Sequence, residues 1–386
     1  WSGSSVSLSS DGKRVAVGAH FNQGNGRNSG HVRVYELQGG TWNQIGADID
    51  GEAENDWSGY SVSLSSDGTR VAVGAYYNDG IFYEPKREDG LDTGHVRIYD
   101  LQGGEWVQIA SDIDGEADYD RSGGSVSLSS DGKRVAVGAN GNDGNRRNSG
   151  HVRVHELQAQ GRWVTQIGSD IDGEAEGDES GRSVSLSSNG NRVAIGAIYN
   201  DGNGSQSGHV RVYDLQAGEW KKIGDDIDGE DRRDSSGYSV SLSSDGNRVA
   251  IGALYNDAIK NNSGHVRVFE LQGGKWKQLG TDIDGEAAGD KSGYSVSLSG
   301  DGTRVAIGAP DNDGANGSQS GHVRVYDLQG GAWVQIGADI DGEAKGDGSG
   351  RSVSLSSDGT RVAVGARNND GNGGASGHVR VYELKG

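Results

Sequence analysis

One sequence unit is repeated seven times along this chain of 386 residues. Each unit contains the hexapeptide SVSLSS, or SVSLSG once, and successive copies begin between 56 and 64 residues apart. A repeat of this length is typical of arrays and propellers, in which each unit buries its apolar faces against its neighbours. The hexapeptides begin at Ser5, Ser61, Ser125, Ser183, Ser239, Ser295 and Ser352.

Each unit reads as four short strands. In the first strand Val6 and Leu8 alternate with serines, which is the period of two that predicts an extended chain. A second strand, RVAVGA or RVAIGA, follows an Asp-Gly pair, or Asn189-Gly190 in one unit, and this pair predicts a tight hairpin with a type I′ turn. The third strand is GHVRVYEL or a close variant, and residues 41–49 exemplify the fourth. The sequence therefore predicts an all-β, seven-bladed propeller with four antiparallel strands per blade.

We expect one domain over residues 1–386, with blades that start near residues 1, 57, 121, 179, 235, 291 and 348. The last unit ends after its third strand, so we expect residues that precede Trp1 in a longer protein to supply a W-x-Q-I-G strand. The low hydrophobic content of 32% and the net charge of −20 would by themselves favour disorder. Regular placement of the apolar residues overrules this, because fixed alternating positions can build a core.

The acidic composition argues against a nucleic-acid partner, since phosphates would be repelled. No apolar run approaches the roughly 20 residues that span a bilayer, so we expect no membrane insertion of this segment. The absence of Cys excludes disulfides and thiolate metal sites.

Residues 292–313 and 320–328 carry a resemblance to a known family. Their sequences are SGYSVSLSGDGTRVAIGAPDND and SGHVRVYDL, and they include Gly308-Ala309-Pro310. The chain resembles the FG-GAP repeat family, the propeller repeats of integrin α subunits and of many secreted or surface proteins. The resemblance implies an extracellular or cell-surface location. The first hairpin has a bare SSDG turn where family members often carry an Asp-rich calcium loop, which argues against calcium there.

In such a meander the loops between strands 2 and 3 and the connectors between strand 4 and the next strand 1 lie on one face, which we expect to be the working face. The connectors contain DxDGE followed by another acid, an oxygen-only set that suits calcium, the one cofactor we consider. The alternative is a solvated acidic loop in which one carboxylate caps backbone amides. The candidate calcium ligands are Asp48, Asp50, Glu52, Asp112, Asp114, Glu116, Asp170, Asp172, Glu174, Asp226, Asp228, Glu230, Asp282, Asp284, Glu286, Asp290, Asp339, Asp341, Glu343 and Asp347.

The 2-3 loops carry three further features. A recurrent Asn-Asp pair, such as Asn200-Asp201, predicts an Asx turn. The second unit inserts aromatic and basic residues that are typical of a protein contact, although an insertion without a role is an equal alternative. The candidate partner-binding residues are Phe82, Tyr83, Lys86 and Arg87, and the candidate glycosylation sites are Asn203, Asn261 and Asn316.

Arg and His recur in every third strand, which favours bonds between blades over a ligand-binding ring. The residues that break the repeat show no catalytic triad or metal-ligand set, so the sequence predicts a protein that is not an enzyme. The first functional hypothesis is a secreted or surface propeller that binds a protein or glycan, as in adhesion, through the 2-3/4-1 face. The alternative is a structural subunit whose copies pack into an extracellular fibre, appendage or matrix. An enzyme is the least favoured class.

Overall fold

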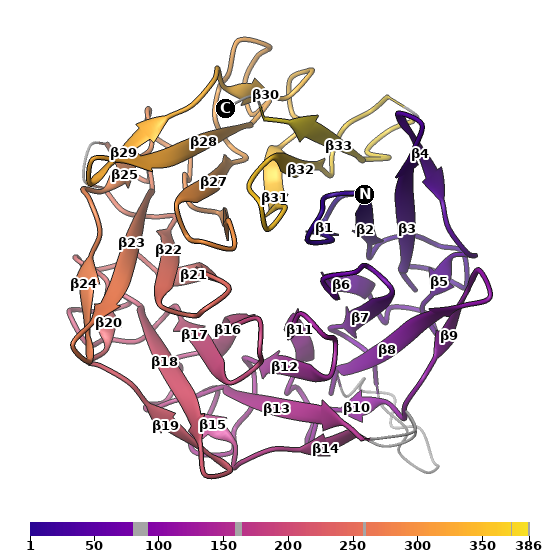
Figure 1. Cartoon of the computed structure of the whole chain (residues 1–386), viewed down its shortest axis with the longest axis horizontal. Helices are drawn as coiled ribbons and strands as arrows, with labels where there is room; N and C mark the ends of the chain where they lie inside the picture. Colours follow the sequence, from indigo (N-terminus) through magenta and orange to yellow (C-terminus); the bar gives the residue numbers. More distant parts are fainter. Residues whose placement is uncertain (80–91, 159–163, 258–259, 372, 385–386) are drawn as a thin grey trace.

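The computed structural model describes the chain except for residues 80–91, 159–163, 258–259, 372 and 385–386. Every regular element in the described part is a strand, and the strands form seven sheets around a central axis (Figure 1). The N-terminus lies near this axis and the C-terminus lies near the rim. The predicted seven-bladed, all-β propeller is confirmed.

The strands of each blade run outward from the axis in chain order, each antiparallel to the one before it. The first strands are β1 (Ser5–Leu8), β6 (Ser58–Leu64), β11 (Ser122–Leu128), β16 (Ser180–Leu186), β21 (Ser236–Leu242), β26 (Ser295–Leu298) and β31 (Ser349–Leu355). The second strands are β2 (Arg14–Ala19), β7 (Arg70–Ala75), β12 (Arg134–Ala139), β17 (Arg192–Ala197), β22 (Arg248–Ala253), β27 (Arg304–Ala309) and β32 (Arg361–Ala366). The third strands are β3 (His31–Gln38), β8 (His95–Gln102), β13 (His151–Leu157), β18 (His209–Gln216), β23 (His265–Gln272), β28 (His322–Gln329) and β33 (His378–Glu383).

The fourth strand is split into an outer and an inner segment that both pair with the third strand. The chain leaves the sheet between the two segments, for example at Gly46, whose φ is 70°. The segments are β4 (Thr41–Gln44) with β5 (Ile49–Asp50), β9 (Glu105–Gln108) with β10 (Ile113–Asp114), β14 (Val164–Gln166) with β15 (Ile171–Asp172), β19 (Glu219–Lys222) with β20 (Ile227–Asp228), β24 (Lys275–Gln278) with β25 (Ile283–Asp284), and β29 (Ala332–Gln335) with β30 (Ile340–Asp341). The last blade has three strands.

The first hairpin forms as predicted, but its type I′ turn is wrong. The amide of Gly12 donates to the carbonyl of Ser9 over 2.9 Å, so the two central residues of the turn are Ser10 and Asp11. Gly12 has a φ of 62°, whereas Ser10 and Asp11 are not among the described residues with positive φ. This is the pattern of a type I turn followed by a left-handed glycine. Asp11 favours it because its carboxylate accepts from the Ser9 hydroxyl and the Lys13 amide.

The apolar core lies between blades. Val32 and Val34 of the first blade pack with Val62, Leu64 and Tyr99 of the second, and equivalent clusters recur around the ring. Because both faces of a blade are covered in this way, the alternating valines of the second and third strands are buried on both sides.

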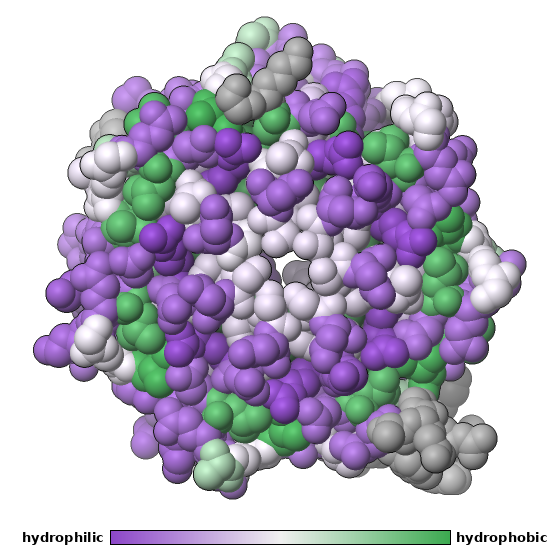
Figure 2. Space-filling view, in the orientation of Figure 1, coloured by the Kyte–Doolittle hydropathy of each residue, from purple (hydrophilic) through white to green (hydrophobic). Residues whose placement is uncertain are grey.

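The serines of the first strand bond one blade to the next. The Ser5 hydroxyl donates to the carbonyl of Gly59 over 2.9 Å, and the Leu64 amide donates to the Ser7 hydroxyl over 2.9 Å. Backbone hydrogen bonds between successive blades also form a ring around the axis. The Ser10 amide donates to the Ser66 carbonyl over 2.8 Å, and the ring closes where the Ser357 amide donates to the Ser10 carbonyl over 3.0 Å. The ring therefore closes through its innermost strands, and a hollow remains on the axis (Figure 2).

Candidate functional site

The central hollow of the propeller is lined by different residues at its two ends. At the 1-2 turns the opening is lined by the repeated serines and aspartates, including Ser10, Asp11, Ser66 and Asp67. At the 2-3/4-1 face a cavity of about 370 Å³ is lined by residues that differ from blade to blade. We call this cavity the axial pocket. Its lining makes it the place where the sevenfold repetition is broken.

Two positions of the repeat supply most of this lining. One immediately precedes the SVSLS strand, and the other follows the Gly-Ala that ends the second strand. The first position holds Ser4, Tyr60, Gly124, Arg182, Tyr238, Tyr294 and Arg351 in the seven units. The second holds His20, Tyr76, Asn140, Ile198, Leu254, Pro310 and Arg367. Of the second position, His20 and Arg367 line the pocket. These pocket residues were not predicted from the sequence, although their variation between otherwise repeated strands is the signal that identifies them.

Guanidinium groups and aromatic rings are paired in the axial pocket. Arg182 lies over the ring of Tyr238 at 4.5 Å, and its Nη2 donates to the Tyr238 hydroxyl over 2.9 Å. Arg351 lies 4.6 Å from the ring centre of Tyr294. Arg367 lies 5.0 Å from that of Trp1. Stacking of this kind orients the flat guanidinium group and leaves N–H donors free at its edges.

The charge of these arginines is not balanced by acids. No acidic residue lines the axial pocket, and within the described part of the chain Arg182, Arg351 and Arg367 form no ion pair. This contrasts with the net charge of −20 of the whole chain. The axial pocket is thus a local positive site in an acidic protein, which is suited to an anionic group.

His20 contributes a neutral ring to the wall. Burial, together with the charges of Arg367 and Arg351, lowers its pKa from 6.5 to about 3. Its Nδ1 has no hydrogen-bond partner among the described residues. Beside it, the rings of Phe21 and Trp57 have centres 4.5 Å apart and extend the aromatic surface. The pocket therefore offers an apolar wall and a free imidazole nitrogen next to its arginines.

Tyr238 and Tyr294 form a coupled pair whose ring centres are 4.9 Å apart. Burial favours the neutral phenol of Tyr238, but Arg182 and a hydrogen bond with Tyr294 outweigh it and lower the pKa of Tyr238. Burial and the neighbouring Tyr238 raise the pKa of Tyr294. Tyr238 is therefore the member of the pair that loses its proton first.

The connector carboxylates proposed as calcium ligands have several different partners. Asp290 accepts from the Ala287 amide at 2.8 Å and from the Asn312 side chain at 3.0 Å, so it caps the connector as the alternative interpretation expected. Glu286 reaches Arg324 of the next blade. The equivalent caps are Asp56, Asp120, Asp178, Asp234 and Asp347. The acids of one connector are thus distributed over two blades, and calcium binding there stays a prediction.

Most arginines of the third strands bond neighbouring blades, as the sequence predicted, whereas Arg33 pairs with Asp48 of its own blade. Arg97 Nη2 donates to the backbone carbonyl of Asp50 in the preceding connector over 2.8 Å. The same bond is made by Arg153, Arg211, Arg267 and Arg324 to the carbonyls of Asp114, Asp172, Asp228 and Asp284. These arginines are therefore structural and do not line the axial pocket.

The structure bears on the three predictions for the 2-3 loops to different extents. The predicted Asx turn is present, since Asn200 Oδ1 accepts from the Gly202 amide over 2.8 Å. Two sequon asparagines are engaged: Asn203 Nδ2 donates to the carbonyls of Gly229 and Glu230, and Asn316 Nδ2 donates to that of Gly342. Asn261 is exposed. Phe82, Tyr83, Lys86 and Arg87 lie outside the described residues.

The fold and the axial pocket define a seven-bladed β-propeller that presents an irregular, arginine-containing pocket on one face. Residues 170–213 and 281–326 match the FG-GAP repeat. The chain therefore contains FG-GAP repeats within a seven-bladed β-propeller, and the resemblance noted in its sequence is confirmed. No helix in the described part is long and apolar enough to cross a membrane.

Solved structures of other propellers resemble this one at low sequence identity. Hydrazine synthase of Kuenenia stuttgartiensis has a TM-score of 0.61 and 16% identity, with 98% of this chain and 94% of that chain covered. The periplasmic gluconolactonase PpgL of Pseudomonas aeruginosa has a TM-score of 0.60 and 18% identity, with 95% and 91% covered. A putative 6-phosphogluconolactonase of Bacteroides uniformis has a TM-score of 0.58 and 14% identity, with 89% and 86% covered. No curated protein matches the sequence.

These similarities correct one prediction. The sequence predicted a protein that is not an enzyme, with an enzyme as the least favoured class, because the residues that break the repeat show no catalytic triad or metal-ligand set. The similar structures include proteins named as gluconolactonases, so that prediction is corrected to leave an enzyme open. At 14–18% identity the likeness establishes the fold alone.

Proposed function

We propose that this propeller binds an acidic sugar of a glycan in the axial pocket. The observation that carries the proposal is the convergence of Arg182, Arg351 and Arg367, without a described carboxylate partner, in a cavity that is lined by aromatic rings. Arginine recognises planar or polyatomic anions through paired N–H donors, which is the chemistry needed for a carboxylate or sulfate group.

The remaining walls support a ring-shaped ligand. Trp57, Tyr60 and Phe21 present flat apolar surfaces against which the less polar face of a sugar can pack. The volume of about 370 Å³ falls in the range of roughly 300–1,000 Å³ in which proteins hold small ligands. A cavity of this volume fits one terminal or branching sugar residue of a glycan better than a long stretch of the glycan chain.

The family supports the setting in which such binding would be used. FG-GAP repeats are typical of extracellular and surface proteins, so we place the protein there and assign the pocket to recognition of acidic glycans, as in adhesion. The alternative of a fibre subunit makes no use of the axial pocket.

Calorimetric titration with a galacturonic acid trimer, a sulfated galactose oligomer and a neutral galactose trimer tests the proposal. We expect binding of an acidic sugar and none of the neutral one. Arg351→Gln should weaken binding at least about tenfold, because a hydrogen bond to a charged group is lost. Arg147→Gln is the matched control, since Arg147 is exposed and lies outside the pocket.

Two outcomes would contradict the proposal. Equal binding of the neutral trimer would show that the arginines do not select the ligand. Equal loss in both arginine variants would show that the effect comes from overall charge and not from the axial pocket.

A second candidate function is hydrolysis of a sugar lactone in the same pocket, the reaction implied by the names of two similar structures. The specific observation in its favour is Tyr238, whose pKa is lowered beside Arg182. Its phenolate would take a proton from water, the water oxygen would attack the lactone carbonyl, and the ring oxygen would leave and be protonated. The arginines would then hold the product carboxylate.

A pH-stat assay of gluconolactone opening, corrected for the spontaneous reaction, tests this second function. Activity that disappears in Tyr238→Phe, with the binding of acidic sugars retained, would support it. A rate equal to the spontaneous one, or full activity in Tyr238→Phe, would reject it.

A further inference from the structure

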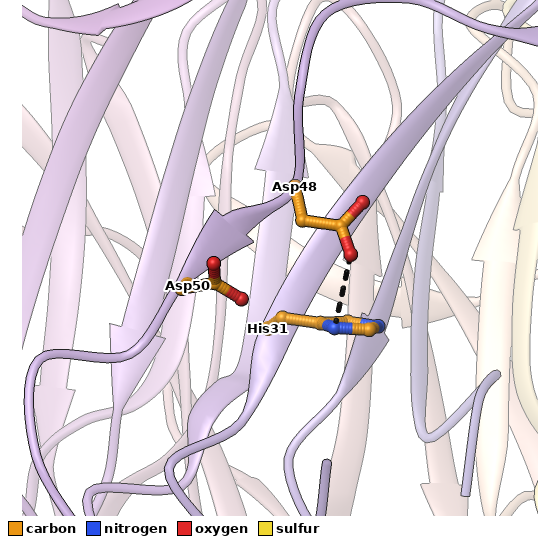
Figure 3. Close-up of side chains that lie close together, drawn as sticks. All are labelled: His31, Asp48 and Asp50. Carbon is orange, nitrogen blue, oxygen red and sulfur yellow. Dashed lines mark ion pairs between the residues drawn. The ribbon is translucent and has the colours of Figure 1, made fainter. Parts of the chain in front are cut away.

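Four junctions between neighbouring blades contain the same group of three side chains. Each group joins a glutamate of one connector to a histidine and an aspartate of the next blade. The groups are Glu52, His95 and Asp112; Glu116, His151 and Asp170; Glu174, His209 and Asp226; and Glu230, His265 and Asp282. The histidine starts the third strand, and the aspartate stands just before the inner segment of the fourth strand. The first blade has a related group of His31, Asp48 and Asp50 (Figure 3).

The distances within a group are too long for hydrogen bonds. His265 Nδ1 lies 3.8 Å from Glu230 Oε2 and 3.9 Å from Asp282 Oδ2. His95 Nδ1 is 3.9 Å from an oxygen of both Glu52 and Asp112. Hydrogen bonds of this type measure about 2.7–3.2 Å. Two ligands of one tetrahedral Zn²⁺, bound at about 2.0–2.2 Å, lie roughly 3.3–3.5 Å apart, so a small contraction would bring the three donors onto one ion.

The histidines are buried, and each has a ring nitrogen without a hydrogen-bond partner among the described residues. His95, His151, His209 and His265 are at most 1% exposed, and Nε2 of each has no hydrogen-bond partner among the described residues. His265 has no partner on either ring nitrogen. A buried polar atom without a partner costs roughly 1–3 kcal/mol, so a ligand for Nδ1 of His265, the nitrogen that faces the carboxylates, would stabilise its junction.

Neighbouring side chains turn the carboxylates toward the histidine. Gln278 Nε2 donates to Asp282 Oδ1 over 2.6 Å, which leaves Oδ2 directed at His265. Arg267 lies 3.5 Å from Glu230 Oε1, which leaves Oε2 for the same histidine. Outer contacts of this kind orient the ligands of metal sites. With one arginine, two carboxylates and a neutral imidazole, the groups of His95, His151 and His265 keep a net negative charge that attracts a cation. In the His209 group Lys222 also pairs with Asp226 over 2.6 Å, so its charges cancel.

We propose that the junction of Glu230, His265 and Asp282 binds a Zn²⁺-type transition-metal ion through these three side chains, and that the equivalent junctions at His95 and His151 do the same. The imidazole nitrogen decides the class of metal, because calcium takes oxygen ligands and zinc takes nitrogen and oxygen. The sites would hold neighbouring blades together, and they are independent of the axial pocket.

Calorimetric titration of the chelator-treated full chain with Zn²⁺ tests the proposal. We expect at least three equivalents to bind. Glu230→Gln should bind one equivalent fewer, and so should His265→Asn. The matched control is Asp231→Asn, which removes an exposed carboxylate from the same connector without touching the group. It should bind as many ions as the unchanged chain.

Because His265 is buried, its substitution could unfold the protein. Glu230 is partly exposed, so Glu230→Gln tests metal binding in a chain that is expected to stay folded. Absence of Zn²⁺ binding, or unchanged stoichiometry in Glu230→Gln, would overturn the proposal. Equal binding of Ca²⁺ and Zn²⁺, both lost in Glu230→Gln, would also overturn it, since the imidazole would then not select the metal. Loss of one equivalent in Asp231→Asn as well would indicate unspecific attraction by the acidic connector.

Discussion

His155 differs from its counterparts in the other blades. It occupies the position of Tyr99, Tyr213, Phe269 and Tyr326, and it is buried with no partner for its Nδ1 among the described residues. Burial, with help from Arg153 and His151 and against the pull of Asp170, lowers its pKa to about 4. The repeat shows that an aromatic ring fits this site.

We predict that His155→Tyr makes the protein less sensitive to acid. The pKa of His155 is lower in the folded state than in the unfolded state, so the unfolded state binds the proton first as pH falls. Stability is therefore present above about pH 6.5 and is lost as pH falls toward 4. The variant should reduce the slope of unfolding free energy against pH by up to about 1.4 kcal/mol per unit in this window.

Urea unfolding at about pH 7, 6 and 5 measures this slope. His155→Phe is the control, since it removes the titrating group without adding a hydroxyl. Identical slopes for all three proteins would show that His155 does not contribute.

At the scale of the strand, the glycine of the second strand sets how closely blades approach. Gly252 of β22 faces the carbonyl of Gly293 in the next blade, and an added Cβ would overlap that oxygen. The Ser239 hydroxyl donates to the same carbonyl over 2.8 Å. This contact explains why the Gly-Ala of the second strand is kept in every unit even where the following residue changes.

Gly252→Ala should lower the free energy of unfolding by about 1–3 kcal/mol, because the blades cannot separate without breaking this hydrogen bond. Gly374→Ala is the matched control. An added Cβ there meets no atom within 4 Å, and the residue does not have a positive φ. The expected change in the control is within about 0.5 kcal/mol, or slightly stabilising. Equal effects of the two substitutions on urea unfolding would contradict the close-approach argument.

At the scale of the whole molecule, charge is unevenly distributed. The net charge is −20, and acidic side chains gather in the connectors, while the axial pocket carries uncompensated arginines. Mutual repulsion among the connectors opposes the folded ring, because folding brings them to one face.

We therefore predict that the melting temperature rises by several degrees between about 0.02 M and 0.5 M salt, as screening shortens the range of repulsion. Melting in sodium chloride and in tetramethylammonium chloride checks the cause. A rise in sodium chloride alone would indicate binding of a specific cation and would contradict simple screening.

The sequence by itself determined the architecture. Alternating valines, serines and glycine-containing turns are local signals that recur in each unit, so they predicted the strands, the seven blades and the bonds between blades by Arg97 and its equivalents. The sequence made two local errors. The turn type was wrong, because the Ser9 hydroxyl stabilises Asp11 in a turn that the Asp-Gly pair alone does not predict. The fourth strand, expected over residues 41–49, is split at Gly46 into two segments.

The tertiary structure alone decided where the candidate sites lie. Arg182, Arg351 and His20 come from three different units. They meet because closure of the ring brings the start of every first strand, and the end of the second strand paired with it, to the axis. Likewise Glu230 meets His265 of the following blade and not the other acids of its own connector. Such contacts depend on how the blades pack against one another. The spacing of residues along the sequence does not determine the distance between side chains of two blades that pack face to face.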